Sequence, residues 1–182
     1  MTNDVSKTLN TIALLVLAIP LLIDFAIQLT TGPLPCPLCL LQRIAVAGVA
    51  VGLILNLACG IRPSHYAVMI LSAVLGGSVA LGQITLHIVP GTGTYGPPLF
   101  GFHLYTWAFG VFGAIVILSA AMLLFDQQYK ADDDLDPQRM SGLAKIACTL
   151  IVLITLGNVA STFLECGLAE CPANPETYIM LQ

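Results

Sequence analysis

The sequence predicts an all-α integral membrane protein, because it is too apolar for a soluble domain and its apolar residues fall into long stretches. Of its 182 residues, 57% are hydrophobic and only 9% are charged, and the mean hydropathy is +0.92. A bilayer core about 30 Å thick requires roughly 20 apolar residues per helix. Five stretches come near this length, at residues 11–29, 44–58, 67–88, 104–125 and 146–164.

The first stretch, residues 11–29, has the position of a secretory signal peptide, but we interpret it as a retained helix. It is long, it contains Asp24 and Gln28, and no small-residue cleavage pattern follows it. The next two stretches and the last are predicted from length and hydropathy alone. The fourth begins near Tyr105 and Trp107, which fit an aromatic belt at the outer membrane interface.

The basic residues predict the orientation, because short loops rich in Lys and Arg remain in the cytoplasm. With five spans, Arg43 falls on one side of the membrane. The other basic residues fall on the opposite side: Lys7, Arg62, Lys130, Arg139 and Lys145. We therefore expect a cytoplasmic amino terminus and an outer carboxyl terminus. The net charge of −4 arises mainly between the fourth and fifth stretches, in a segment that we interpret as a solvated loop rather than a docking or metal site: Asp126, Asp132, Asp133, Asp134 and Asp136.

Four of the six cysteines form two pairs that are expected to face the same compartment. Cys36 and Cys39 follow the first stretch, and Cys166 and Cys171 follow the last. The extracytoplasmic compartment of a bacterial cell is oxidising, so paired cysteines there form disulfides or exchange them. The remaining cysteines have no near partner in sequence and are interpreted as inert small apolar residues: Cys59 and Cys148.

The first pair is a candidate for thiol redox chemistry at the membrane surface. Cys39 is expected to open a membrane helix, whose free N–H groups and dipole favour an anion. Arg43, one helical turn later, adds a charge that arginine retains even in a region of reduced dielectric. A thiolate stabilised there attacks disulfides or donates electrons. Two alternatives stay open: both pairs are structural staples, or the four cysteines bind zinc.

A membrane quinone is the expected electron acceptor, because the sequence has no glycine-rich nucleotide fingerprint following a strand. A quinone needs an apolar slot, hydrogen-bond donors and a nearby cation. Residues at the depth of Cys39 that can supply these are Gln28, Arg43, His87 and His103. Gln28 and Gln83 fit helix-to-helix hydrogen bonds equally well, and the histidines fit interfacial positions. Asp24 fits a proton carrier or a neutral hydrogen-bonded group, and we assign it neither role.

A family resemblance is carried by the segment PCPLCLLQR at residues 35–43, by Gln28 eight residues before Cys36, and by the segment GFHLYTW at residues 101–107. These residues resemble the signature of the disulfide-bond-formation protein B (DsbB) family. The resemblance extends over residues 10–125. It implies an inner-membrane protein-disulfide oxidoreductase, built on a four-helix transmembrane bundle, that uses ubiquinone or menaquinone.

The resemblance also implies roles for individual residues. A periplasmic thioredoxin-like dithiol oxidase (DsbA-like) would be the partner that is reoxidised. Cys39 would face the quinone, and Cys36 would exchange with the second cysteine pair. Arg43 would bind or polarise the quinone, and His87 would line its site. Through these roles the chain would support disulfide bond formation on the periplasmic side of the bacterial inner membrane.

The chain departs from the family pattern in the position of the second cysteine pair. That pair is usual in the outer loop between helices three and four, but residues 89–103 contain no cysteine here. Cys166 and Cys171 lie beyond a fifth helix instead. We therefore expect a four-helix redox core at residues 1–125, an acidic cytoplasmic loop at 126–145, and a fifth helix with a periplasmic tail at 146–182. In the expected relay, the partner reduces the tail pair, which reduces Cys36–Cys39.

Three other functions compete with this interpretation. His87 and His103 together fit the axial ligands of a haem in an electron-transfer subunit. A non-catalytic accessory subunit would use both disulfides as staples. A vitamin-K-epoxide-reductase-like enzyme would share the thiol and quinone chemistry, but the Cys-x-x-Cys segment after the first helix favours the DsbB pattern.

Overall fold

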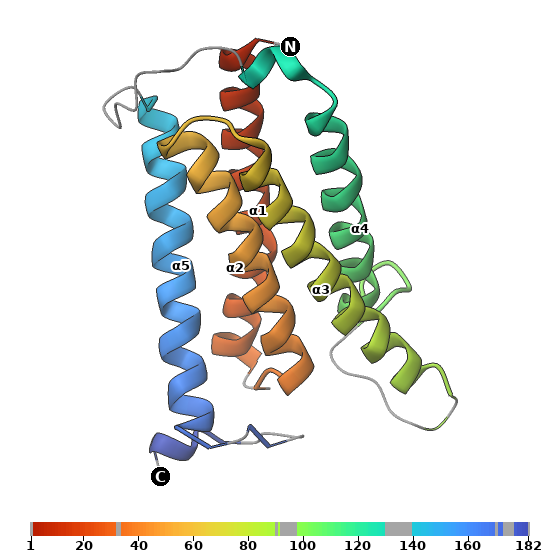
Figure 1. Cartoon of the computed structure of the whole chain (residues 1–182). Coiled ribbons are helices and arrows are strands. Elements are labelled where there is room, and N and C mark those ends of the chain that lie inside the picture. Colours follow the sequence, from red (N-terminus) through yellow and green to blue (C-terminus); the bar gives the residue numbers. More distant parts are fainter. Residues whose placement is uncertain are drawn as a thin grey trace.

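The computed structural model is an all-α bundle, described here for residues 2–31, 34–89, 91, 98–129, 140–169, 171–172 and 177–181. Its long helices are α1 (Asn3–Thr31), α2 (Pro37–Ala58), α3 (Pro63–His87), α4 (Leu104–Leu123) and α5 (Gly142–Cys166) (Figure 1). Among these residues, short 3-10 helices follow α4 and α5, namely η1 (Asp126–Tyr129) and η3 (Ile179–Leu181). All five long helices are long and apolar enough to cross a membrane, which confirms the predicted fold class.

Helices α1 and α2 begin earlier than hydropathy predicts. In α1, the polar residues before residue 11 bond along the helix, as when Asn10 Nδ2 donates to the carbonyl of Ser6 at 2.7 Å. In α2, Pro37 occupies the first turn, where its fixed φ and missing N–H cost nothing. Cys36 is the N-cap, and its Sγ accepts a hydrogen bond from the Cys39 N–H at 3.2 Å. The prediction that Cys39 opens this helix is therefore wrong by two residues.

The helices pack in the order α4, α3, α2, with α1 and α5 closing the other side of α2 (Figure 1). Apolar side chains from all five long helices form the core, among them Leu14, Val49, Leu53 and Ile151. Gly76 lets α3 approach its neighbours closely, because an added Cβ would collide with Phe112 of α4 and Ala45 of α2. Helix α5 is therefore an integral part of the bundle that carries the first cysteine pair.

A buried polar network holds together the end of the bundle that contains the amino terminus. Asn10 Nδ2 donates to the Tyr66 hydroxyl, which donates to Gln128 Oε1, both at 3.2 Å. Asn56 Nδ2 donates to Asn10 Oδ1 at 3.1 Å. These bonds join α1, α2, α3 and η1, and each satisfies a polar group that would be costly to bury alone. The cysteine pairs lie at the opposite end (Figure 1).

The described basic residues follow the predicted division between the two ends. Lys7, Arg62 and Lys145 belong to the end with the amino terminus, and Arg43 lies near the other end. The remaining members of the predicted basic set and most of the acidic loop lie outside the described residues: Lys130, Asp132, Asp133, Asp134, Asp136 and Arg139.

Candidate redox site

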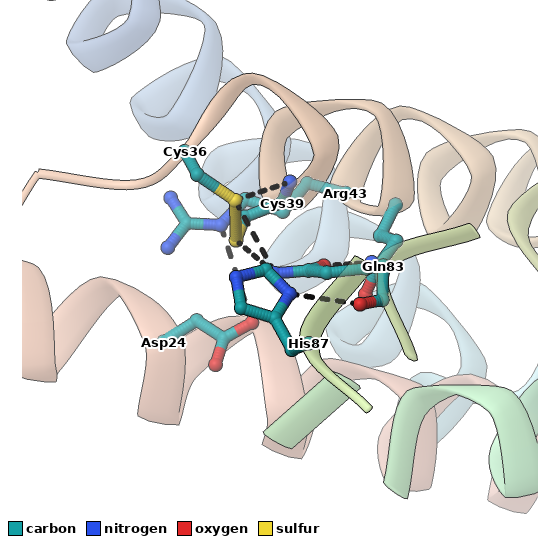
Figure 2. Close-up of a disulfide and its surroundings, with 7 residues drawn as sticks. Asp24, Cys36, Cys39, Arg43, Gln83 and His87 are labelled. Atoms are coloured by element: carbon teal, nitrogen blue, oxygen red, sulfur yellow. Dashed lines mark hydrogen bonds and ion pairs between the residues drawn. A yellow bond between two sulfur atoms is a disulfide. The ribbon is translucent and has the colours of Figure 1, made fainter. Parts of the chain in front are cut away.

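The first cysteine pair forms a disulfide at the start of α2, tucked against the bundle (Figure 2). Leu34 and Pro35 before it are buried, and Cys36 is 5% exposed. Cys39 is half-buried. In this disulfide form, Cys36, the cysteine that the family pattern assigns to exchange, is therefore the less accessible of the two. The backbone N–H of Cys39, in the first turn of α2, donates to the Cys36 sulfur, an arrangement that favours a thiolate at Cys36 upon reduction.

Gln83 of α3 is the polar neighbour of this disulfide. Its Nε2 lies 3.5 Å from Cys36 Sγ and 3.6 Å from Cys39 Sγ, within donating distance of both sulfurs. The Gln83 side chain is 1% exposed, and Gln42 Nε2 fixes its orientation by donating to Oε1 at 2.8 Å. His87 Nδ1 lies 2.8 Å from the Gln83 carbonyl, one turn along α3 (Figure 2). Gln83 was not among the predicted site residues, although a glutamine within an apolar span signals a functional or packing role.

Arg43 forms the centre of a second group of polar side chains. Its Nη1 donates to Gln28 Oε1 at 2.8 Å and to Asn158 Oδ1 at 3.0 Å. Its Nε lies 4.0 Å from Asp24 Oδ2 and makes no hydrogen bond with the described residues. Arg43 also interacts electrostatically with Glu165. We call Asp24, Gln28, Arg43, Asn158 and Glu165 the Arg43 cluster; it joins α1, α2 and α5.

The second cysteine pair, Cys166 and Cys171, forms its own disulfide at the end of α5. Gly167 caps this helix with a φ of 62°, a conformation that favours glycine. The tail then returns to the bundle, because η3 packs on α5 and the Tyr178 hydroxyl accepts a hydrogen bond from Gln28 Nε2 at 3.1 Å. The second disulfide is thus tied to the same end of the bundle as the first.

The two predicted histidines lie together, but apart from the contacts of Arg43. The His87 ring stacks on Tyr105 with ring centroids 5.5 Å apart, and the His103 ring stacks on Tyr105 at 5.3 Å. His103 is the N-cap of α4, and its Nδ1 is buried without a hydrogen bond among the described residues. The four predicted quinone-binding residues therefore form two pairs, Gln28 with Arg43 and His87 with His103.

An apolar pocket of about 420 Å³ lies between α2 and α5 and touches both the Arg43 cluster and the second disulfide. Arg43 and Asn158 supply polar groups to its wall, which Cys166 and Cys171 also line. The other lining residues are mostly apolar, such as Ile44. A slot of this kind, with few polar groups and one cation, suits a planar apolar molecule with hydrogen-bond acceptors.

A comparison with known protein families identifies the family to which this chain belongs. The family model described as disulfide bond formation protein DsbB matches residues 6–95. The chain belongs to the DsbB family. The match spans α1, α2 and α3, including the first disulfide, and ends before α4 and α5. No significant match was found among curated proteins or among solved structures.

Membership of the DsbB family makes the chain a multi-pass membrane protein of disulfide bond formation. Helix α5 and the second disulfide are additions to the matched segment, and they are consistent with the variant that the sequence predicts. The unpaired cysteines Cys59 and Cys148 are exposed and half-buried, respectively.

The geometry of the histidines and cysteines disfavours the haem and zinc alternatives. A haem coordinated by His87 and His103 would need space between the two rings, but both rings stack on the buried Tyr105. The cysteines form two separate disulfides, and within the described parts of the chain no three His, Cys, Asp or Glu side chains gather as a metal site.

Gln83→Met should make the first disulfide of this DsbB family member less oxidising. A donor at the sulfurs stabilises the thiolate form, so its loss disfavours reduction. One hydrogen bond of about 1 kcal/mol corresponds to a decrease of roughly 20 mV in reduction potential. The potential is measured by equilibration with a glutathione buffer in a variant lacking Cys166 and Cys171. Thr85→Val, which removes an exposed hydroxyl of the same helix, serves as the control; equal potentials in both variants would contradict the role of Gln83.

Proposed function

We propose that the protein is a membrane thiol:quinone oxidoreductase that passes electrons from a dithiol partner through its cysteine pairs to a quinone. The observation that carries this proposal is a disulfide at the start of a membrane helix, with Gln83 at its sulfurs and Arg43 one turn along the same helix. This arrangement supports a stabilised thiolate and a cation at the depth where a lipid-soluble oxidant arrives.

The proposed location is the bacterial inner membrane, with both disulfides on the periplasmic side. Lys7, Arg62 and Lys145 at the amino-terminal end support this orientation by the positive-inside rule. In this orientation both cysteine pairs meet an oxidising compartment. The proposed partner is a thioredoxin-like dithiol oxidase of the DsbA type.

We propose residues 1–125 as the redox core, 126–145 as a cytoplasmic loop, and 146–182 as a helix and tail that complete the site. Support for the last assignment comes from Asn158 and Ser161 of α5. Asn158 accepts a hydrogen bond from Arg43, and Ser161 accepts one from Gln28 at 2.7 Å. The fifth helix therefore contributes to the polar site rather than only anchoring the tail.

The residues beside the first disulfide fit a quinone, either ubiquinone or menaquinone. A bound quinone would supply an acceptor for two electrons and two protons. Arg43 has a buried Nε without a hydrogen bond among the described residues, which is a donor suited to a ring oxygen. Gln28 orients the guanidinium through Nη1. His87 and His103 would line the opposite side of the disulfide, where His103 Nδ1 also lacks a partner among those residues.

The second disulfide is proposed to receive electrons from the partner. A partner thiolate attacks one sulfur of Cys166–Cys171, forms a mixed disulfide and releases the other sulfur as a thiolate. The second partner thiol resolves this bond and leaves the tail as a dithiol. The tail dithiol then reduces Cys36–Cys39 by the same two exchanges. Each pair of exchanges transfers two electrons in total, and the protons lost by the attacking thiols are taken up by the thiolates that are released.

The test is anaerobic quinone reduction by the purified protein, supplied with a reduced thioredoxin-like protein as donor. We expect turnover that requires both donor and protein. If neither a protein dithiol nor a small dithiol supports quinone reduction, the accessory-subunit interpretation replaces this proposal.

Arg43→Lys should weaken quinone use while leaving the first disulfide intact. Lysine keeps the positive charge but lacks the planar fork that contacts Gln28 and Asn158 together. Loss of one hydrogen bond to a charged group, about 1.5–3 kcal/mol, corresponds to an increase in the KM for quinone of roughly 10- to 100-fold. Arg62→Lys, at the other end of the bundle, is the control. Unchanged quinone kinetics in Arg43→Lys would remove Arg43 from the site.

A further inference from the structure

Glu165 is a charged residue of the Arg43 cluster, and the proposed exchange between cysteine pairs gives it no role. It is the next-to-last residue of α5, and its side chain is 0% exposed. Neither carboxyl oxygen has a hydrogen-bond partner among the described residues. Ser161, one turn earlier on the same face of α5, accepts a hydrogen bond from Gln28. Glu165 therefore lies on the face of α5 that carries Ser161, the partner of Gln28 in α1.

The charges around Arg43 do not balance if every group is ionised. The groups that interact electrostatically with its guanidinium are Asp24 from α1, Glu165 from α5 and Tyr178 from the tail. One cation facing two carboxylates would leave a net negative charge in an apolar bundle. Burying such an uncompensated charge is strongly unfavourable. The cluster is neutral only when one of the two carboxyl groups holds a proton.

The geometry indicates which of the two carboxyl groups holds the proton. Asp24 Oδ2 lies 4.0 Å from Arg43 Nε and forms the ion pair of the cluster (Figure 2). Asp24 is also the more exposed carboxyl, with 36% of its side chain accessible. Glu165 is fully buried and has no hydrogen-bond donor among the described residues to stabilise a carboxylate. The neutral acid is the form that this environment accommodates.

We propose that Glu165 is the proton carrier of the redox site. This inference rests on the proposed function, in which two electrons and two protons move from a dithiol to a quinone. When electrons arrive beside Arg43, the Glu165 carboxyl would donate its proton to the reduced acceptor and become a carboxylate. A thiol that is deprotonated for the next exchange returns a proton to Glu165. The proton of the second thiol reaches the acceptor through water at the membrane surface, so the overall reaction balances.

Infrared spectroscopy of the quinone-free, oxidised protein tests the protonation state directly. The chain has three glutamates, Glu165, Glu170 and Glu176. Labelling with [¹³C]glutamate therefore shifts the side-chain carboxyl bands of these residues and not those of the aspartates. We expect a labelled band of a protonated carboxyl group at neutral pH. It should be absent from Glu165→Gln and retained in Glu170→Gln. A missing band in the natural protein, which requires no variant to fold, would overturn the proposal, as would a band that persists in Glu165→Gln.

The pH dependence of turnover tests the role of the proton. Glu165→Gln keeps the shape of the side chain but carries no proton to donate, so we expect turnover to fall by about 10²-fold, the usual contribution of a positioned proton donor. The loss should increase as pH rises, because protons from solution become scarce. A purely structural role would lower turnover equally at every pH, and that result would overturn the proposal.

The outcomes separate this inference from the function on which it rests. Quinone reduction that persists unchanged in Glu165→Gln would overturn the proton role and leave the oxidoreductase intact. A natural protein without any turnover would remove the oxidoreductase proposal and the proton role together, whatever the infrared spectrum shows.

Discussion

Cys39→Ala is expected to abolish quinone reduction, with turnover falling to the rate of the mixture without protein. Cys36 and Cys39 form one disulfide in the structure, so removing either sulfur leaves no pair to close. Electrons from any donor, protein or small molecule, would then not reach the quinone. The measurement is the anaerobic loss of quinone absorbance with excess reduced dithiol.

The controls for this result are the unpaired cysteines. Cys59→Ala and Cys148→Ala each remove a thiol that belongs to neither disulfide, and both variants should retain full turnover. Quinone reduction that survives in Cys39→Ala would show that the first pair is a structural staple, and the oxidoreductase proposal would fail.

A donor that lacks its resolving cysteine identifies which sulfur the incoming thiolate attacks. The family pattern assigns exchange to Cys36, but Cys36 is 5% exposed and Cys39 is half-buried. The donor thiolate attacks the intact Cys36–Cys39 disulfide, forms a mixed disulfide with one sulfur and releases the other as a thiolate. Attachment of the donor at Cys36 would show that Cys36 becomes accessible during exchange. Attachment at Cys39 would mean that Cys39 is attacked first.

Hydropathy and charge predict the fold well because a bilayer imposes a length on each span. All five spans were predicted, and the largest differences lie at the starts of α1 and α2. Those starts are polar or proline-containing, so a hydropathy window omits them. In the structure they are helical; Asn10 bonds to the Ser6 carbonyl along α1, and Pro37 suits the first turn of α2.

The candidate site was only partly predictable, because side-chain contacts between distant helices leave little trace in one sequence. Depth arguments placed Gln28 and Arg43 at the same level, and the structure joins them by a 2.8 Å hydrogen bond. Depth alone cannot distinguish the sides of a bundle, so it also grouped His87 with them. Asn158 and Glu165 were overlooked, although polar residues within an apolar helix are a recognisable signal.

Cys166→Ala is expected to separate the two kinds of donor. Turnover with a reduced thioredoxin-like protein should fall to background, because the tail disulfide that receives its electrons is gone. Turnover with a small dithiol should remain, since such a molecule reaches the half-buried Cys39 without the tail. The measurement is the same quinone assay, run with each donor in parallel.

The structure also allows the tail disulfide to serve only as a staple, and the variants distinguish the two roles. Reduction or loss of Cys166–Cys171 would free the segment that brings Tyr178 to Gln28. Tyr178→Phe removes that hydrogen bond and leaves both sulfurs in place. If the tail disulfide were only a staple, Tyr178→Phe and the double variant Cys166→Ala/Cys171→Ala would lower turnover similarly with both donors. The relay predicts that only the cysteine variants lose turnover with the protein donor, because exchange needs sulfur atoms and not merely an ordered tail.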